Sequence, residues 1–241
     1  MKTRILIMFI CLIFSVRCIN SQETIRRITP DRITHSFFKK ISPYYGKTSF
    51  PFYSGKLKSR EYYLKFQGYE WCPYKKYVDS RLPLYAGTDK NIAESEQFIM
   101  ALFYETNGEY FIGVSMAWSA NHNDHKRLLT TYSLDGNVID YIIFEESNEC
   151  SPEQVYTVEG VINKDLTVNI YSRKFVGGRY PVNSSYRAID GLEGQRIDYH
   201  YKITPQGKFS LLREVKYQPK KYVGSELSGT QSIANGNELK L

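Results

Sequence analysis

The second half of the chain alternates apolar and polar positions in the pattern of a half-buried β-strand. In residues 166–171, Leu, Val and Ile alternate with Thr, Asn and Tyr, which is the period of two that a pleated strand requires. Runs rich in β-branched and aromatic residues recur along the same half. Eight segments are predicted to be strands: 97–104, 109–118, 127–133, 138–145, 155–162, 166–174, 196–204 and 208–217.

Short polar sequences separate these segments in pairs. Thr106-Asn107-Gly108 and Asp135-Gly136 have strong hairpin signatures, because Gly accepts a positive φ and Asn or Asp can hydrogen-bond the turn backbone. Residues 163–165 and 205–207 separate the other two pairs. The sequence therefore predicts a mainly β fold, an antiparallel meander of about eight strands. It does not choose between a closed barrel, a half-open sheet and a sandwich.

The flanking regions suggest four parts: a signal peptide (1–21), an aromatic and basic region that wraps the sheet (22–94), the β domain (95–222) and a mobile tail (223–241). Within the second part, apolar residues at helical spacing between Ile33 and Ile41 follow Pro30, which predicts a short helix or an ordered arm. The tail is rich in Ser, Gly and Asn and poor in large apolar residues.

The first residues have the features of an export signal. Lys2 and Arg4 precede an apolar run from Ile5 to Val16, which is too short to cross a bilayer. Cleavage after residue 21 predicts a periplasmic, outer-membrane-associated or secreted protein. The alternative is a lipoprotein with Cys18 as the lipidated residue. No later stretch is apolar enough to predict a transmembrane segment.

The charge distribution and the cysteine content bear on the expected partners and on a possible disulfide. The formal charge of +7 falls to +4 without the signal, and an acidic middle (81–170, −9) lies between basic flanks. Contacts within the protein explain this distribution better than a nucleic-acid footprint does, so no nucleic-acid partner is expected. An oxidising compartment permits a disulfide between Cys72 and Cys150, although two unpaired thiols explain the sequence equally well.

Two hairpin motifs and the end of the signal peptide resemble sequences found in other exported proteins. The signal ends in Ser-Gln-Glu, residues 129–140 read Leu-Thr-Thr-Tyr-Ser-Leu-Asp-Gly-Asn-Val-Ile-Asp, and residues 201–209 read Tyr-Lys-Ile-Thr-Pro-Gln-Gly-Lys-Phe. With these features the chain resembles uncharacterised exported proteins of Bacteroides-like bacteria over residues 95–217. The resemblance implies no catalytic residues.

The candidate binding surface is aromatic and basic. Aromatic rings can stack on sugar rings, and Tyr hydroxyls add polar edges. The alternative is that these rings pack on the sheet while the neighbouring lysines stay in water. The residues chosen for ligand binding are Tyr62, Tyr63, Tyr69, Trp71 and Arg179.

The candidate metal ligands are His122, Asp124 and His125, because imidazoles and a carboxylate suit a transition metal. A further ligand would have to come from His35, His200 or Glu145. The alternative is a polar connecting loop. A carboxylate pair for hydrolysis is also conceivable, although Asp135 fits a turn.

Other acidic residues have structural explanations. Asp140 fits a strand, either facing solvent or buried beside a basic group, and Glu145, Glu146 and Glu149 suggest a solvated edge. Nucleophile and phosphate-loop motifs are absent from the sequence.

The sequence therefore predicts an exported non-catalytic protein that binds a glycan, an envelope component or a protein partner, with no cofactor. A metal- or carboxylate-dependent envelope hydrolase is the alternative, and a structural subunit that docks through a sheet edge or its tail is a third. The sequence leaves the oligomeric state open.

Overall fold

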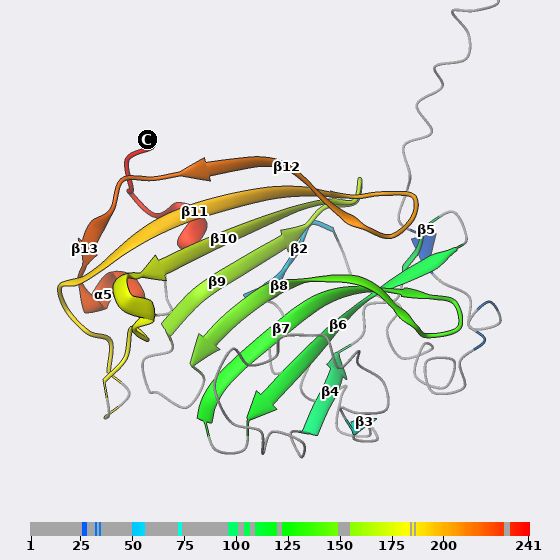
Figure 1. Ribbon diagram of the computed structural model, residues 1–241, viewed down its shortest axis with the longest axis horizontal. Helices are drawn as coiled ribbons and strands as arrows, with labels where there is room; N and C mark the ends of the chain where they lie inside the picture. Colours follow the sequence, from blue (N-terminus) through cyan, green and yellow to red (C-terminus); the bar gives the residue numbers. More distant parts are fainter. Residues whose placement is uncertain are drawn as a thin grey trace, which may run out of the picture.

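The protein is a mainly β molecule built on one antiparallel sheet, as the sequence predicts (Figure 1). The computed structural model describes residues 26–27, 32, 34, 50–55, 72–73, 96–100, 104–106, 109–119, 122–148, 155–183, 185, 187–228 and 232–241. Its strands are β1 (Arg26–Arg27), β2 (Phe52–Tyr53), β3 (Cys72–Pro73), β4 (Glu96–Met100), β5 (Tyr104–Thr106), β6 (Tyr110–Ser119), β7 (His122–Ser133), β8 (Val138–Asn148), β9 (Val155–Ile162), β10 (Thr167–Phe175), β11 (Leu192–Ile203), β12 (Phe209–Lys216) and β13 (Lys220–Tyr222).

Sequential pairing from β6 to β12 confirms the meander. The hairpins β7–β8, β9–β10 and β11–β12 form where the turn sequences place them. At the first of these turns, Gly136 has φ 87° and donates its N–H to the Ser133 carbonyl at 2.8 Å. Asp135 accepts hydrogen bonds from the Ser133 hydroxyl and from the Asn137 amide, which confirms its role as a turn residue. The Ser133 bond is the main reason that the pKa of Asp135 is lowered.

The first predicted hairpin differs from the structure. Two short strands, β4 and β5, share the pairing that the sequence assigns to residues 97–104, and both run antiparallel to β6. β7 begins at His122, inside the expected polar loop. β7 is a central strand that pairs with both β6 and β8. Cross-strand ion pairs, such as Lys126 with Glu146 at 3.2 Å, stabilise its polar residues within the sheet.

The sheet opens between β8 and β9 (Figure 1). These strands pair only near Asn148 and Val155, and β2 pairs with the far end of β9 instead. Phe52 of β2 stacks on Phe144 of β8 with ring centroids 6.4 Å apart. The main core lies here, between the two halves of the curled sheet, and comprises Phe52, Tyr110, Ile112, Val114, Leu129, Phe144, Val158, Ile162, Leu166, Val168, Ile170 and Ile203.

Turn docking holds the two halves together at one end. The Thr131 hydroxyl donates to the Gly207 carbonyl at 2.6 Å, and the Phe209 N–H donates to the Asp140 carboxylate at 2.9 Å. Asp140 is therefore half-buried and bound to a backbone amide, which neither sequence interpretation anticipated. Within the described residues β12 pairs only with β11, so the sheet is open: the half-open form among the three alternatives.

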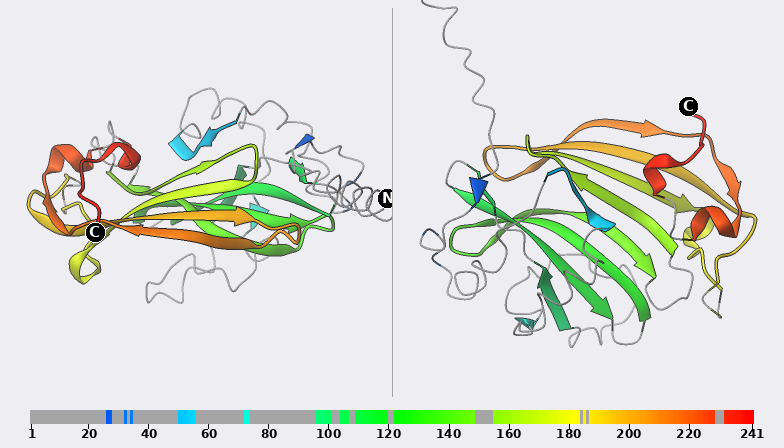
Figure 2. Two further views of the ribbon diagram at one scale, coloured as in Figure 1. Left: turned by 90° about the horizontal axis from the view of Figure 1, so that it is seen from above. Right: turned by 180° about the vertical axis from the view of Figure 1, so that it is seen from behind.

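The segments after β10 complete the fold (Figure 2). The Gly-, Ser- and Arg-containing segment after β10, which the sequence suggests is an insertion over residues 176–196, ends earlier, because Leu192 already belongs to β11 and is buried. It includes the short helix η5 (Val176–Gly178). The tail contains α5 (Gly224–Leu227) and η6 (Ile233–Asn235), and η6 lies against β9 and β10. In the part of the chain that the structure describes, no helix has the length and apolar character needed to cross a membrane.

Candidate functional site

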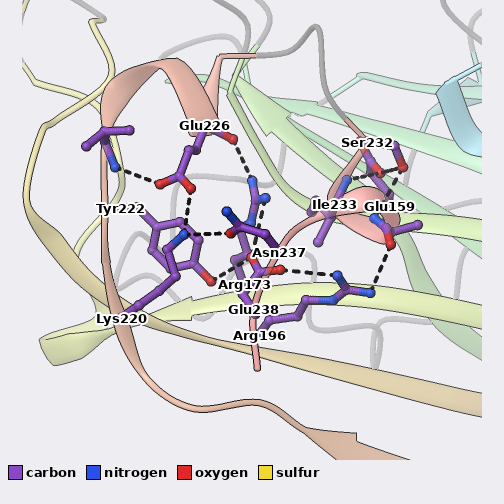
Figure 3. A network of polar contacts seen from close by, with 12 residues as sticks. Glu159, Arg173, Arg196, Lys220, Tyr222, Glu226, Ser232, Ile233, Asn237 and Glu238 are labelled. Atoms are coloured by element: carbon purple, nitrogen blue, oxygen red, sulfur yellow. Dashed lines mark hydrogen bonds and ion pairs between the residues drawn. The ribbon is translucent and has the colours of Figure 1, made fainter. Parts of the chain in front are cut away.

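The most elaborate polar site in the described residues joins the tail to β9, β10, β11 and β13 (Figure 3). We call it the tail network. Its charged members come from segments up to 79 residues apart in the chain, and the sheet brings them together. The members are Glu159, Arg173, Arg196, Asp198, Tyr217, Lys220, Tyr222, Glu226, Ser232, Asn237 and Glu238.

Arg196 is the centre of the tail network. It is 4% exposed, and its guanidinium donates two hydrogen bonds to Asp198, each of 2.8 Å. The two residues are two positions apart on β11 and therefore share a face of the sheet. The Tyr217 ring lies 4.5 Å from the guanidinium carbon, and the Tyr217 hydroxyl donates to Asp198 at 2.9 Å. Burial alone would lower the pKa of Arg196, but the Asp198 bonds raise it, so this cation is permanent.

Glu238 brings the tail into this cluster. Its carboxylate accepts a hydrogen bond from Arg196 at 3.2 Å and one from the Tyr222 hydroxyl at 3.1 Å, and lies 3.6 Å from Arg173. Burial would raise the pKa of Glu238, but its own backbone N–H and the two arginines hold the pKa below its ordinary value. The side chain is therefore a buried, paired carboxylate.

A second ion pair, between Lys220 and Glu226, lies beside Arg173. Lys220 donates to Glu226 at 2.5 Å and to Asn237 of the tail at 3.1 Å. Glu226 also accepts the Val223 N–H at 3.1 Å, at the start of α5. Its backbone carbonyl accepts a 2.9 Å bond from Arg173. The helix and the tail are thus linked through the same two basic side chains.

The chemistry of the tail network is carboxylate binding rather than acid–base catalysis. Burial, followed by the charge of Glu238, raises the pKa of Tyr222, and burial together with the Asp198 bond raises that of Tyr217. Both hydroxyls therefore stay protonated and act as donors. Glu238 stays ionised, and its contacts are with groups of its own chain. The network fixes the tail on the sheet.

Glu238→Gln should make stability less dependent on pH in the acid range. The lowered pKa means that the charged form stabilises the fold above about pH 4.5, the ordinary value, and that this contribution is lost as pH falls through the native pKa. We expect the variant to be about 1–3 kcal/mol less stable at pH 7. The difference should shrink as pH falls below 4.5 and through the lowered native pKa of Glu238.

Urea denaturation at several pH values measures this difference. The pKa values of Asp135, Asp165 and Glu226 are lowered as well, so these groups also make the stability of the parent depend on pH. The difference between variant and parent removes their contribution and leaves that of Glu238. Glu193→Gln, at an exposed position of β11, is the matched control. A difference that stays constant with pH would contradict the assigned ion pairs.

A separate buried ion pair joins β7 and β8. Arg127 and Glu145 face each other across the two strands, form a salt bridge, and are each 1% exposed. The Ser147 hydroxyl lies 3.5 Å from the same carboxylate. The interpretation of Glu145 as part of a solvated edge is therefore wrong. Pairing with Arg127, 18 residues away, makes burial of this carboxylate tolerable.

The edge of the sheet at β12 has a different character. Leu211 and Leu212 are 49% and 62% exposed, and they lie in β12 at a bulge opposite His200 and Tyr201. The tail continues this edge: Gln218 N–H donates to the Leu239 carbonyl at 2.7 Å, and Leu241 N–H donates to the Lys216 carbonyl at 3.0 Å. We call β12 together with residues 239–241 the leucine edge.

The structure brings few of the sequence-selected residues together. Arg179 is exposed directly after η5. His122, Asp124 and His125 lie in β7, and their side chains are outside the described part of the structure. Cys72 lies in β3, whereas Cys150 is outside the described residues. The aromatic residues Tyr62, Tyr63, Tyr69 and Trp71 are outside them too, as are the signal and nearly all of the predicted N-terminal helix.

Sequence reasoning missed both ionic sites. One local signal was available: Arg196 and Asp198 are two positions apart in a strand and so predict a same-face pair. Glu238 has no such signal, since its partners lie 42 and 65 residues away. Among the described residues, no group of three or more His, Cys, Asp or Glu side chains could hold a metal ion.

Comparison with protein-family models, with curated proteins and with solved structures found no match to this chain.

Proposed function

We propose that the protein is an exported, non-catalytic binding protein that engages a partner protein of the cell envelope through the leucine edge. One observation carries the proposal: four leucines along this edge, Leu211, Leu212, Leu239 and Leu241, are 49%, 62%, 68% and 74% exposed. Single exposed leucines are ordinary, but several along one strand edge are typical of an interaction surface.

The backbone of the edge supports the same conclusion. The Lys216 carbonyl accepts the Leu241 N–H, and the Gln218 N–H donates to the Leu239 carbonyl, so residues 239–241 pair here as a neighbouring antiparallel segment would. An extended partner segment could pair with the remainder of β12 in the same way. A bulge opposite His200 and Tyr201, together with charged residues on β12, limits indiscriminate pairing.

The side chains favour a protein over a glycan at this edge. Leucine side chains gain free energy by contacting other apolar side chains, whereas sugar recognition uses aromatic faces. Tyr199 and Tyr201 do stack beside β12, with centroids 6.3 Å apart, but both are half-buried against the core. The glycan hypothesis depends on the aromatic segment around Trp71, outside the described residues.

The test compares immobilised parent protein with Leu211→Lys/Leu212→Lys in detergent-solubilised envelope extract from cells that make the protein. We expect one discrete protein species to be retained by the parent and at least ten-fold less by the double variant. Ser210→Lys, an exposed position on the same strand, is the matched control and should retain it fully. Equal retention by the double variant, or retention that survives protease treatment of the extract, would contradict the proposal.

A further inference from the structure

The last ten residues contact the sheet in the way that a bound peptide contacts its receptor. We call residues 232–241 the tail peptide. Its contacts fall into three groups: an apolar anchor, a carboxylate anchor and a strand pairing. The receptor side of these contacts comes from β9, β10, β11, β13 and the link between β12 and β13 (Figure 3).

Ile233 is the apolar anchor. It is fully buried. Glu159 of β9 positions it by accepting the Ile233 N–H at 2.7 Å and the Ser232 hydroxyl at 2.6 Å. Both bonds use a single carboxylate oxygen of the sheet. Burying an isoleucine side chain contributes about 1.5–3 kcal/mol in itself, so this anchor is substantial for so short a segment.

Glu238, five residues later, is the carboxylate anchor. It occupies the site between Arg173 and Arg196 with a Tyr222 hydroxyl bond in addition. Both arginines belong to the sheet and are at most 5% exposed with the tail in place, so the carboxylate is bound in a desolvated setting. Gly236 lets the chain approach this closely: a Cβ there would meet the Glu238 carboxylate, with Oε1 at 2.8 Å.

Strand pairing completes the recognition. Residues 239–241 add to the sheet beside Tyr217 through main-chain hydrogen bonds, which do not depend on side-chain identity. Leu239, Lys240 and Leu241 are all exposed. Ser232 and Asn237 add exposed or partly buried polar contacts, and the buried or sterically restricted positions are Ile233, Gly236 and Glu238, a spacing that reads aliphatic-x-x-Gly-x-Glu.

We propose that this face of the sheet is a peptide-binding site, with the chain's own tail as its intramolecular ligand. A partner protein with an extended segment of the pattern aliphatic-x-x-Gly-x-Glu takes the place of the tail peptide. The carboxylate of that segment pairs with Arg173 and Arg196, and its aliphatic side chain fills the position of Ile233. Tethering gives the tail a high effective concentration, so the intact chain resists competitors and binds them once the tail is released.

The experiment uses the full chain with a specific protease site introduced between Ser228 and Ser232. A fluorescent synthetic peptide of residues 232–241 reports binding by anisotropy, before and after cleavage. We expect at least a 100-fold gain in apparent affinity on cleavage. As a competitor, the peptide with Glu238→Gln should be at least ten-fold weaker than the unmodified peptide, and that with Lys240→Ala should be unchanged.

Two outcomes overturn the proposal directly: no gain on cleavage, or equal competition by the Glu238→Gln peptide. A third peptide, which keeps only Ile233, Gly236 and Glu238 and has alanine elsewhere, should compete within ten-fold. Its failure would also overturn the proposal, because the site would then accept the tail sequence alone and no partner segment of this pattern. If the cleaved chain loses its near-UV circular dichroism once the tail is washed away, added peptide should restore it in proportion to concentration. Absence of rescue would also overturn the proposal.

Discussion

Gly160→Ala should lower the melting temperature by about 6–12 °C, the largest effect that we expect from adding a methyl group to any glycine that the structure describes. Gly160 lies in β9 just beyond the residues that pair with β8, where the sheet opens. A Cβ there would lie 2.6 Å from the backbone oxygen of Phe144 and would also overlap its ring. The ring could rotate only into the core that it shares with Phe52, and the backbone oxygen cannot rotate away.

The magnitude follows from overpacking. Extra methyl groups in tightly packed interiors cost about 1–3 kcal/mol, and a clash with main chain lies at the upper end, about 3 kcal/mol. In a domain of this size each kcal/mol shifts the melting temperature by about 2–4 °C. Gly55→Ala is the matched control, since nothing lies within 4 Å of its Cβ position, and should melt within about 2 °C of the parent. Equal melting temperatures for the two variants would contradict the close approach of Phe144 in β8 to Gly160 in β9.

Glu145→Leu should cost about 3–5 kcal/mol in the free energy of unfolding, because it leaves the Arg127 guanidinium buried without its salt-bridge partner. The double variant Arg127→Met/Glu145→Leu should recover most of this loss. Replacing both members of a buried ion pair by apolar residues of similar volume is often neutral or stabilising. Urea unfolding of the parent, both single variants and the double variant completes the cycle.

The neighbouring pair of residues supplies the control. Lys126 and Glu146 are opposite each other on the same two strands, 3.2 Å apart, with about a fifth of each side chain exposed. Glu146→Gln should therefore cost less than about 1 kcal/mol. A Glu145→Leu cost as small as that of Glu146→Gln would mean that the Arg127–Glu145 pair is exposed to water in solution.

The sequence predicted the parts of the fold that local chemistry controls. Asp135 and Gly136 form the turn expected of them, and the segment 155–162 is a strand with the predicted boundaries. The extension of β7 back to His122 could not be predicted, since it depends on pairing with two neighbouring strands rather than on the polar residues themselves. The choice of an open sheet depends on bonds between segments about 70 residues apart, such as that from Phe209 to Asp140.

The sites were harder to predict than the strands. Glu238 lies among small polar residues that suggest a mobile tail, yet in the structure it is buried between two arginines of the sheet. Polar contacts, with Ile233 as an apolar anchor, hold this segment, so a scarcity of large apolar residues was a poor guide. The exposed leucines could not be predicted either. Leu211 and Leu212 have the apolar character of core residues, and they are exposed because β12 lies at the edge of the sheet.

Photocrosslinking in the cells that naturally produce the protein tests the central claim, partner binding at the leucine edge, most directly. A photoreactive amino acid replaces Leu212 in one strain and Lys164, an exposed turn residue far along the chain from β12, in another. The account predicts one protease-sensitive adduct of discrete mass from position 212 and none from position 164. Adducts of equal yield at both positions, or none at position 212, would contradict it.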